Sequence, residues 1–180
     1  YLFDVKVNKS NKTFRVFGGC LYNKDLSTLI YVPECKDYEC RIPPSTFHIV
    51  EGALKKCDGL KLFEVDEENE AYATIEGVLF TKDLKTLIRC PPNKEGSCII
   101  PEPTAEIADG AFAGCQHLKL FEVAEKNQSF TSLDGVRFSK DLRKLISYPS
   151  RRDKDFAIPK ETVEIDDYAF IERSLIWGLS

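Results

Sequence analysis

A single period of 58 residues organises the whole chain. Residues 69–92 and 127–150 share 10 identities over 24 aligned positions, far more than composition alone would give. Two short motifs recur at the same interval: Ile-Pro begins at Ile42, Ile100 and Ile158, and Lys-Asp-Leu begins at Lys24, Lys82 and Lys140. Repetition at a fixed period is typical of solenoids, because one unit cannot bury its apolar face alone and neighbouring units must stack.

The period sets the expected domain organisation. We expect one solenoid domain over residues 1–180, with full units at 42–99 and 100–157 and partial units at 1–41 and 158–180. The chain has no Met, which indicates a segment of a longer protein.

The first part of each unit, for example Ile100 to Val123, alternates between two apolar spacings. A spacing of two predicts a short strand at 105–107 and a second strand in the Leu118-x-x-Phe-x-Val segment. Between them, the Ala-Phe-x-x-Cys-x-x-Leu spacing of three predicts one helical or 3₁₀ turn. Strand, helical turn and strand within about 24 residues is typical of one leucine-rich coil.

The second part of each unit, for example residues 124–157, has the signals of an antiparallel meander. Asp134-Gly135 between alternating apolar residues predicts a hairpin, and the Lys140-Asp141 turn predicts a second reversal. Asn127 recurs at the period, and we expect its side chain to cap a turn. The fold class is therefore a mostly-β (α+β) leucine-rich-repeat solenoid with short strands, short helical turns and inserted β-hairpins.

These motifs resemble the BspA-like, or Treponema-type, leucine-rich repeat proteins. The matching pattern is IPxxxxxIxxxAFxxCxxLxxFxV followed by NxxFxxxDGVxFxKDLxxLIxYP, and its best copies cover 42–91 and 100–149. The chain departs from the pattern at Glu51 and Ala108, where Gly is usual, and after Phe170, where Arg173 takes the Cys position. We expect Trp177 to cover the open edge of the last coil.

The resemblance implies a function as well as a fold. Family members are secreted or surface proteins of mucosal bacteria and protist parasites, linked to adhesion and host-matrix binding. The implied partner is a protein or an extracellular-matrix or cell-surface macromolecule. The leading hypothesis is a non-enzymatic binding or adhesion module outside the cell. The alternatives are an intracellular scaffold or regulatory protein-interaction module in the cytoplasm, and the stalk of a larger chain with an enzymatic domain elsewhere.

Composition and motifs argue against other function classes. A net charge of −4 with both signs mixed does not favour nucleic-acid binding. No apolar run approaches the roughly 20 residues that span a bilayer, so we expect no direct membrane insertion by this segment. The two histidines, His48 and His117, occupy different repeat positions without a nearby metal-type partner. We therefore expect no enzyme activity, no cofactor and no metal.

The seven cysteines divide into two groups when they are placed on the repeat. Cys20, Cys57 and Cys115 fall at apolar positions and are expected to be buried as small hydrophobes. Two pairs flank equivalent loops, and we predict local disulfides between their members: Cys35–Cys40 and Cys90–Cys98. The alternatives are a zinc site and free thiols, and an odd count leaves at least one cysteine over.

Three sequons offer candidate glycosylation sites at Asn8, Asn11 and Asn127. They are consistent with an extracellular eukaryotic protein, although two of them coincide with the Asn of the repeat.

The candidate binding face is the strand that ends each coil. Stacked coils are expected to bring these strands into one extended sheet. Its outward positions form two columns: Lys6, Glu64 and Glu122 in one, and Phe3, Lys61 and Lys119 in the other. The second candidate surface is the set of turns at Lys24, Lys82 and Lys140, and the alternative is that all these side chains are merely solvated.

Overall fold

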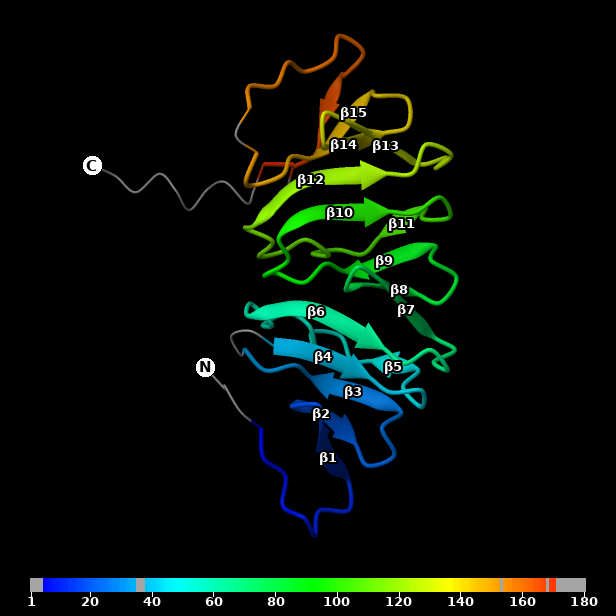
Figure 1. Ribbon diagram of the computed structural model, residues 1–180, viewed down its shortest axis with the longest axis vertical. Coiled ribbons are helices and arrows are strands. Elements are labelled where there is room, and N and C mark those ends of the chain that lie inside the picture. The colour runs from blue at the N-terminus through cyan, green and yellow to red at the C-terminus, as the bar shows by residue number, and fades with distance from the viewer. Residues whose placement is uncertain (1–4, 35–37, 153, 168, 171–180) are drawn as a thin grey trace, which may run out of the picture.

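The computed structural model describes residues 5–34, 38–152, 154–167 and 169–170. Within these residues the chain is a β-solenoid of sixteen strands with no helix. The coils stack along the long axis of the molecule, so that segments 58 residues apart lie one above the other (Figure 1).

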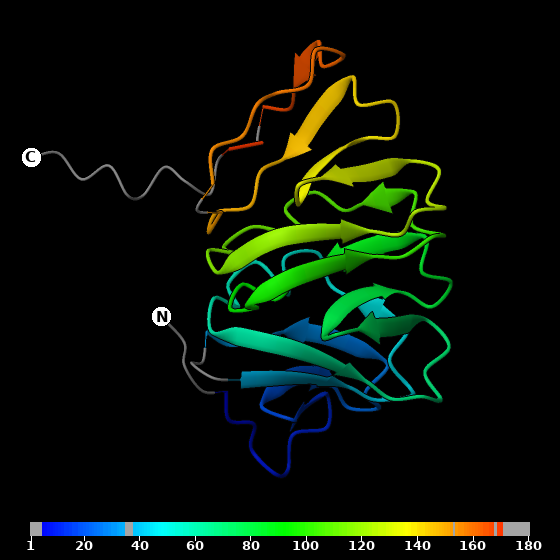
Figure 2. The same cartoon turned by 45° about the horizontal axis from the view of Figure 1, so that its top comes forward.

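Two parallel strand pairs line one side of the solenoid. The strands β4 (Tyr38–Ile42) and β6 (Leu60–Val65) form the first pair, and β10 (Gly96–Ile100) and β12 (Leu118–Val123) form the second. We call these four strands the parallel face. Figure 2 shows the two pairs stacked in the same direction. The second strand predicted for each coil is confirmed by β6 and β12.

Three antiparallel meanders form the rest of the solenoid, and each is closed by a short parallel strand from the next coil. The first contains β1 (Phe14–Phe17), β2 (Cys20–Asn23), β3 (Thr28–Tyr31) and β5 (His48–Ile49). The second contains β7 (Tyr72–Ile75), β8 (Val78–Thr81), β9 (Thr86–Arg89) and β11 (Glu106–Ile107). The third contains β13 (Phe130–Leu133), β14 (Val136–Ser139), β15 (Lys144–Ser147) and β16 (Glu164–Ile165). Both predicted reversals are therefore confirmed, as is the strand near 105–107.

The first reversal of each meander is a tight hairpin that requires glycine. Asp134 and Gly135 have φ values of 50° and 77°, and two successive positive φ values are the mark of a type I′ turn. A Cβ on Gly135 would lie 2.5 Å from the Cβ of Leu120. The turn therefore packs directly onto strand β12, and only glycine leaves room for this contact.

The second reversal explains the Lys-Asp-Leu motif. Leu84 has a φ of 59°, which costs free energy for a residue with a Cβ, but its side chain packs against the buried core. Asp83 stabilises the turn, since its carboxylate accepts from the amide of Lys85 (3.1 Å) and the hydroxyl of Thr81 (2.8 Å). These hydrogen bonds, the amide of Lys85 first, lower the pKa of Asp83.

Buried asparagines join successive coils. The Asn127 side-chain oxygen accepts from the amides of Ser129 (2.9 Å) and Phe130 (2.7 Å), which confirms the predicted turn cap. Its side-chain nitrogen donates to the carbonyls of Pro101 (2.9 Å), Glu102 (3.3 Å) and Thr104 (2.8 Å) in the preceding segment. One amide thus bonds to five backbone groups of two segments, of which the carbonyl of Pro101 also accepts from the amide of Thr104 (3.2 Å).

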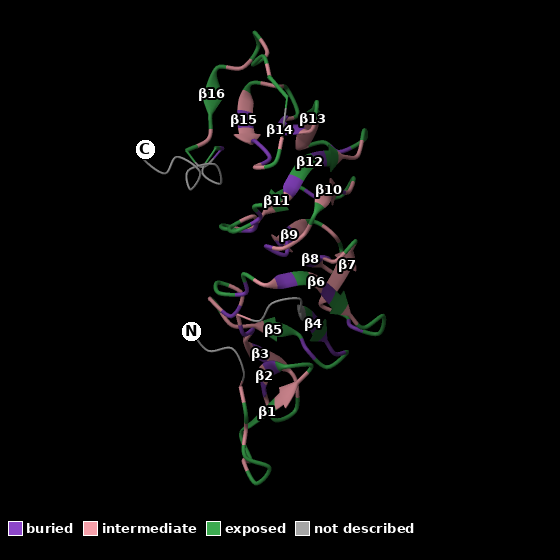
Figure 3. Cartoon of the chain, turned by 60° about the vertical axis from the view of Figure 1, so that its left-hand side comes forward, coloured by how far each residue is buried: buried purple, intermediate pink, exposed green. Residues whose placement is uncertain are grey.

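The core is one apolar cluster per unit, built from equivalent residues. Each cluster holds a buried aromatic ring from the second meander strand and a buried leucine from the third, and Figure 3 shows buried segments inside each coil. The rings are Tyr22, Phe80 and Phe138, and the leucines are Leu29, Leu87 and Leu145. Because equivalent side chains point inward in all three units, the repeat in sequence is also a repeat in space.

The predicted helical turn is wrong. Residues 109–114 form successive turns, in which the amide of Ala111 donates to the carbonyl of Ala108 and the amide of Ala113 donates to the carbonyl of Gly110. Gly110 and Gly114 have φ values of 69° and 80°. A helix needs negative φ throughout, so the glycines break the segment into separate turns.

Candidate binding face

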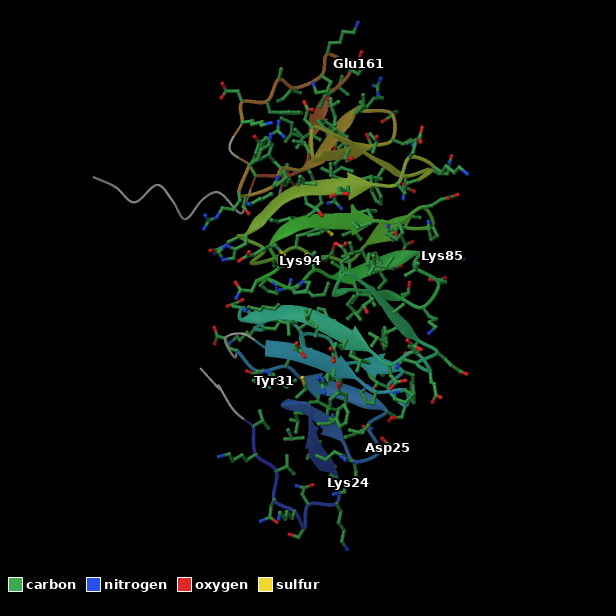
Figure 4. The ribbon with its side chains drawn as sticks, viewed as in Figure 1. Lys24, Asp25, Tyr31, Lys85, Lys94 and Glu161 are labelled. Atoms are coloured by element: carbon green, nitrogen blue, oxygen red, sulfur yellow. The ribbon has the colours of Figure 1, made fainter. Side chains whose placement is uncertain are left out.

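The parallel face is interrupted between its two pairs, so the expected continuous sheet of coil-ending strands is wrong. The hairpin turn of the second meander lies between β6 and β10, with the amide of Phe63 donating to the carbonyl of Gly77 (2.9 Å). The loop after β9 also lies between the two pairs, where the amide of Asn93 donates to the carbonyl of Leu60 at the start of β6 (2.9 Å). Lys94 lies beside this junction (Figure 4), and its ammonium group donates to the carbonyl of Glu76 (2.9 Å).

Four of the predicted face residues lie on the parallel face. Lys61 and Glu64 are exposed on β6, and Lys119 and Glu122 are exposed on β12. Lys6 is also exposed, but it precedes the first strand and extends neither pair. Phe3 lies outside the described residues.

The first strand pair carries a charge network. The guanidinium of Arg41 on β4 lies 2.8 Å from Glu64 and 3.6 Å from Glu39. The Arg41 and Glu64 side chains are 60% and 48% exposed, and ion pairs in that setting contribute little to stability. An open hollow adjoins the network, bounded by Phe17, Pro43 and other residues of β4, β6 and their neighbours.

The second strand pair has the same lysine and glutamate on β12 as the first has on β6, but its other strand differs in chemistry. Ile99 stands where β4 has Arg41, and it lies opposite Glu122 in the register of the pair. Leu120 is 36% exposed. Among the described residues, Glu122 has no ion-pair partner. This pair therefore presents an apolar centre with a lysine and an unpaired carboxylate beside it.

The second predicted surface is the set of turns at Lys24, Lys82 and Lys140, and the ammonium groups of these lysines form hydrogen bonds within the chain. Figure 4 shows Lys24, Asp25 and Lys85 along the edge formed by the meander turns. Each turn lysine donates its ammonium group to a backbone carbonyl: Lys24 to Asn11 (2.7 Å), Lys82 to Glu67 (3.1 Å) and Lys140 to Glu125 (2.9 Å). The recurrence of these lysines thus has a structural explanation, and as a binding surface the exposed turns stay a prediction.

The cysteines of the described residues are all buried thiols, with no disulfide among them. Burial of Cys20, Cys57 and Cys115 was predicted and is confirmed. The predicted Cys90–Cys98 disulfide is not formed. The Cys90 thiol does lie against two other thiols, and hydrogen bonds with Cys115 and then Cys98 raise the pKa of Cys90. Cys35 lies outside the described residues, as does Trp177.

The positions equivalent to Cys90 and Cys98 do meet in the third unit. Tyr148 and Phe156 take those positions, with ring centroids 6.0 Å apart in an edge-to-face arrangement. Spacing alone therefore predicted the contact but not the chemical state of the thiols.

The three sequons differ in accessibility. Asn8 is exposed, Asn11 is half-buried, and Asn127 is fully buried with its amide engaged in five hydrogen bonds. A glycan on Asn127 would displace these bonds, so this candidate site is incompatible with the folded coil.

A buried arginine was missed by the sequence analysis. Arg137 is 5% exposed, and its guanidinium lies over the rings of Phe112 (5.0 Å), Phe121 (5.4 Å) and Phe130 (5.6 Å). Burial lowers its pKa to about 10, and its Nε and one terminal nitrogen have no hydrogen-bond partner. The available signal was the repeat itself, because the equivalent residue in the preceding unit is Leu79.

The side chains that bind metals do not gather at one place in the described part of the chain. The described residues contain no group of three or more His, Cys, Asp or Glu side chains that would hold a metal ion. His48 is exposed on β5, and His117 is half-buried in the turn before β12, so the two belong to separate parts of the coil. A search of the same residues for a helix long and apolar enough to cross a bilayer finds none.

Comparison with known proteins gives two similar solved structures. No protein-family model matches the chain, and no curated protein matches it. The pneumococcal vaccine antigen PcpA is 24% identical, with a TM-score of 0.49 over 80% of this chain and 34% of that one. A leucine-rich repeat protein from Eubacterium ventriosum is 20% identical, with a TM-score of 0.47 over 74% of this chain and 32% of that one. The chain thus spans about a third of the length of each.

Proposed function

We propose that this chain is a non-enzymatic protein-binding module of the leucine-rich-repeat type, and that it works as part of a secreted or cell-surface adhesion protein. One observation supports this above the others. Asn127, Lys82 and Asp83 recur from unit to unit and are used in internal bonds, whereas the first strand of the parallel face changes from YECRI in β4 to GSCII in β10 beside second strands of identical sequence.

These recurring residues form hydrogen bonds that hold the fold together, which explains why they recur. Asn127 joins two coils, Lys82 holds a turn, and Asp83 caps the same turn. The first strand of each pair has no such constraint, as the change from Arg41 on β4 to Ile99 on β10 illustrates, while the exposed lysine and glutamate of the second strand are the same in both pairs. A rigid scaffold with a variable exposed surface is how repeat proteins recognise macromolecules.

The β10–β12 pair is the centre of the proposed binding face. Ile99 and Leu120 provide an apolar centre, and Lys119 and Glu122 provide charged groups beside it. Protein interfaces combine a desolvated apolar centre with a polar rim in this manner. The mixed charge favours a protein partner over a polyanion.

The proposal is tested by measuring the binding of a variant in which two charges on this face are exchanged. The double variant Lys119→Glu with Glu122→Lys keeps the net charge unchanged, and the control Lys85→Glu with Glu106→Lys makes the same exchange on the exposed meander edge. The probes are immobilised fibronectin, laminin and collagen, and cultured epithelial cells. We expect the wild-type chain and the control to bind at least one probe and the face variant to lose that binding. Unchanged binding by the face variant, or no binding by the wild-type chain, would refute the proposal.

The second candidate is an intracellular scaffold or regulatory module, which the free thiols of the described cysteines favour. Because these thiols are buried, alkylation of the protein from lysed native cells in denaturant, without reductant, separates the two. Full labelling of the cysteines together with an unmodified Asn8 supports the intracellular role, whereas a glycan on Asn8 supports secretion.

A further inference from the structure

Two cysteines that are far apart in sequence meet in the core of the first unit. The sulfur of Cys20 on β2 lies 3.5 Å from the sulfur of Cys40 on β4. Both side chains are fully buried, and they belong to the same apolar cluster. The contact joins the meander to the parallel face, which are the two halves of the unit.

We propose that Cys20 and Cys40 are a disulfide-forming pair that cross-links the first unit during oxidative folding. The geometry replaces the pairing of Cys40 with Cys35 expected from sequence spacing. A disulfide bond has an S–S length of about 2.05 Å, so small side-chain movements must bring the two sulfurs together from their contact distance. The proposal concerns chemistry inside the coil and does not rest on the proposed binding function.

The cross-link requires a two-electron oxidant, which we specify as a small-molecule disulfide such as oxidised glutathione. One cysteine thiolate attacks the glutathione disulfide, forms a mixed disulfide and releases one glutathione thiolate. The thiolate of the second cysteine then attacks the protein sulfur of the mixed disulfide and releases the second glutathione. The two cysteines lose two protons and two electrons, and the oxidant is reduced to two thiols.

Burial determines when this reaction takes place. In the folded chain neither sulfur contacts solvent, and the thiol of Cys20 together with burial raises the pKa of Cys40 well above its ordinary value. The attacking species is the thiolate, so folding in the reduced form protects the pair. Oxidant present during folding should therefore form the cross-link, and oxidant added after folding should not.

The cross-link is specific to the first unit. Val78 and Val136 occupy the position of Cys20 in the later units, so Cys98 lacks this partner and its thiol lies against Cys90 instead. These valines also supply a suitable test variant, because Cys20→Val installs the side chain that the repeat itself uses in that environment.

The experiment is peptide mapping after refolding. The reduced, unfolded 180-residue chain is refolded with oxidised and reduced glutathione, remaining thiols are alkylated, and the protein is digested with trypsin without reduction. Cleavage at Lys24, Lys36 and Arg41 places Cys20, Cys35 and Cys40 in separate peptides. The variants are Cys20→Val and, as the matched control for a neighbouring buried thiol, Cys57→Ala.

We expect wild type and Cys57→Ala to yield the peptide 16–24 joined to 37–41, and Cys20→Val to yield an alkylated Cys40. The oxidised wild type should also unfold at a higher urea concentration than its reduced form, and Cys20→Val should lose this difference. The proposal is overturned if Cys40 is joined to Cys35 or Cys57, or if Cys20 and Cys40 are both alkylated in the refolded wild type. It is also overturned if the folded, reduced protein forms the cross-link as fast as the unfolded chain.

Discussion

Replacing Arg137 by leucine should make the protein more stable, although the substitution removes a charged group that three aromatic rings surround. The arginine lies at a fully buried position of the repeat, since Leu79 is 0% exposed at the equivalent place. It forms no ion pair among the described residues. Burial lowers its pKa while the charge of Asp166 acts against this shift, and two of its nitrogens have no hydrogen-bond partner. Arg137→Leu restores the residue that the preceding unit uses.

The expected gain is the balance of three contributions. Burial lowers the pKa of Arg137 to about 10, and a decrease of roughly 2.5 pH units from the usual arginine value corresponds to a cost of about 3 kcal/mol for the charged form. That figure is net of the attraction between the charge and the rings at 5.0 to 5.6 Å. Leucine removes the cost of the charge and replaces the apolar contacts of the arginine stem, but imperfect filling of the larger site costs about 1 kcal/mol. We expect a gain on the order of 2 kcal/mol in the free energy of unfolding.

The pH dependence gives the same prediction a second readout. The pKa of Arg137 is lower in the folded chain than in the unfolded chain, so the unfavourable charge is fully present below pH 10. Above that pH the folded chain releases its proton before the unfolded chain does, and the cost decreases. The advantage of Arg137→Leu over wild type should therefore be constant near neutral pH and shrink as the pH rises above 10.

Urea unfolding followed by far-ultraviolet circular dichroism measures this difference. Arg143→Leu is the matched control, because it removes an exposed arginine and should change stability by less than about 0.5 kcal/mol. A folded Arg137→Leu protein that unfolds at lower urea than wild type, with the control unchanged, would show that the aromatic rings stabilise the guanidinium by more than its desolvation costs.

Three further substitutions test how the coils are joined. Asn127→Ala removes five hydrogen bonds and should lower the free energy of unfolding by about 3 kcal/mol in urea titrations. Gly135→Ala should lower the free energy of unfolding by more than about 2 kcal/mol, because the new Cβ meets Leu120. Gly110→Ala has open space around its Cβ and should cost only about 1 kcal/mol for its positive φ. Equal urea midpoints for the two variants would contradict the close packing at Gly135. Asp83→Asn should reduce the loss of stability that wild type shows as pH falls below about 4, because the hydrogen bond from the amide of Lys85 lowers the pKa of Asp83. The equivalent Asp25 and Asp141 keep their own contributions. Superimposable acid titrations of the two proteins would show that the Asp83 carboxylate does not contribute.

The sequence predicted the elements that local chemistry determines. Alternating apolar residues gave β6 and β12, and Asp134-Gly135 gave its hairpin, because each signal acts on its own few residues. The predicted helical turn failed because apolar spacing was given more weight than Gly110 and Gly114, whose positive φ values stop a helix. The two glycines were the local signal that predicts separate turns in this segment instead of a helix.

Contacts between coils were harder to predict, because they depend on where stacked segments meet. The hairpin turn at Gly77 separates the two strand pairs, which the expectation of one extended sheet did not include. The contact of Cys20 with Cys40 joins strands that sequence spacing does not pair. Arg137 was detectable in principle, since an alignment of the units places it on Leu79, but its aromatic neighbours come from three other segments.

The division between recurring and varying residues has a physical cause. Coils are held together by bonds from a few repeated side chains to backbone carbonyls, and every unit presents those carbonyls whatever its other residues are. The exposed positions of the parallel face take no part in these bonds, so a change such as Arg41 to Ile99 has little structural cost. The face can therefore change its chemistry without loss of the fold, and a binding partner that reads this face should distinguish the β4–β6 pair from the β10–β12 pair.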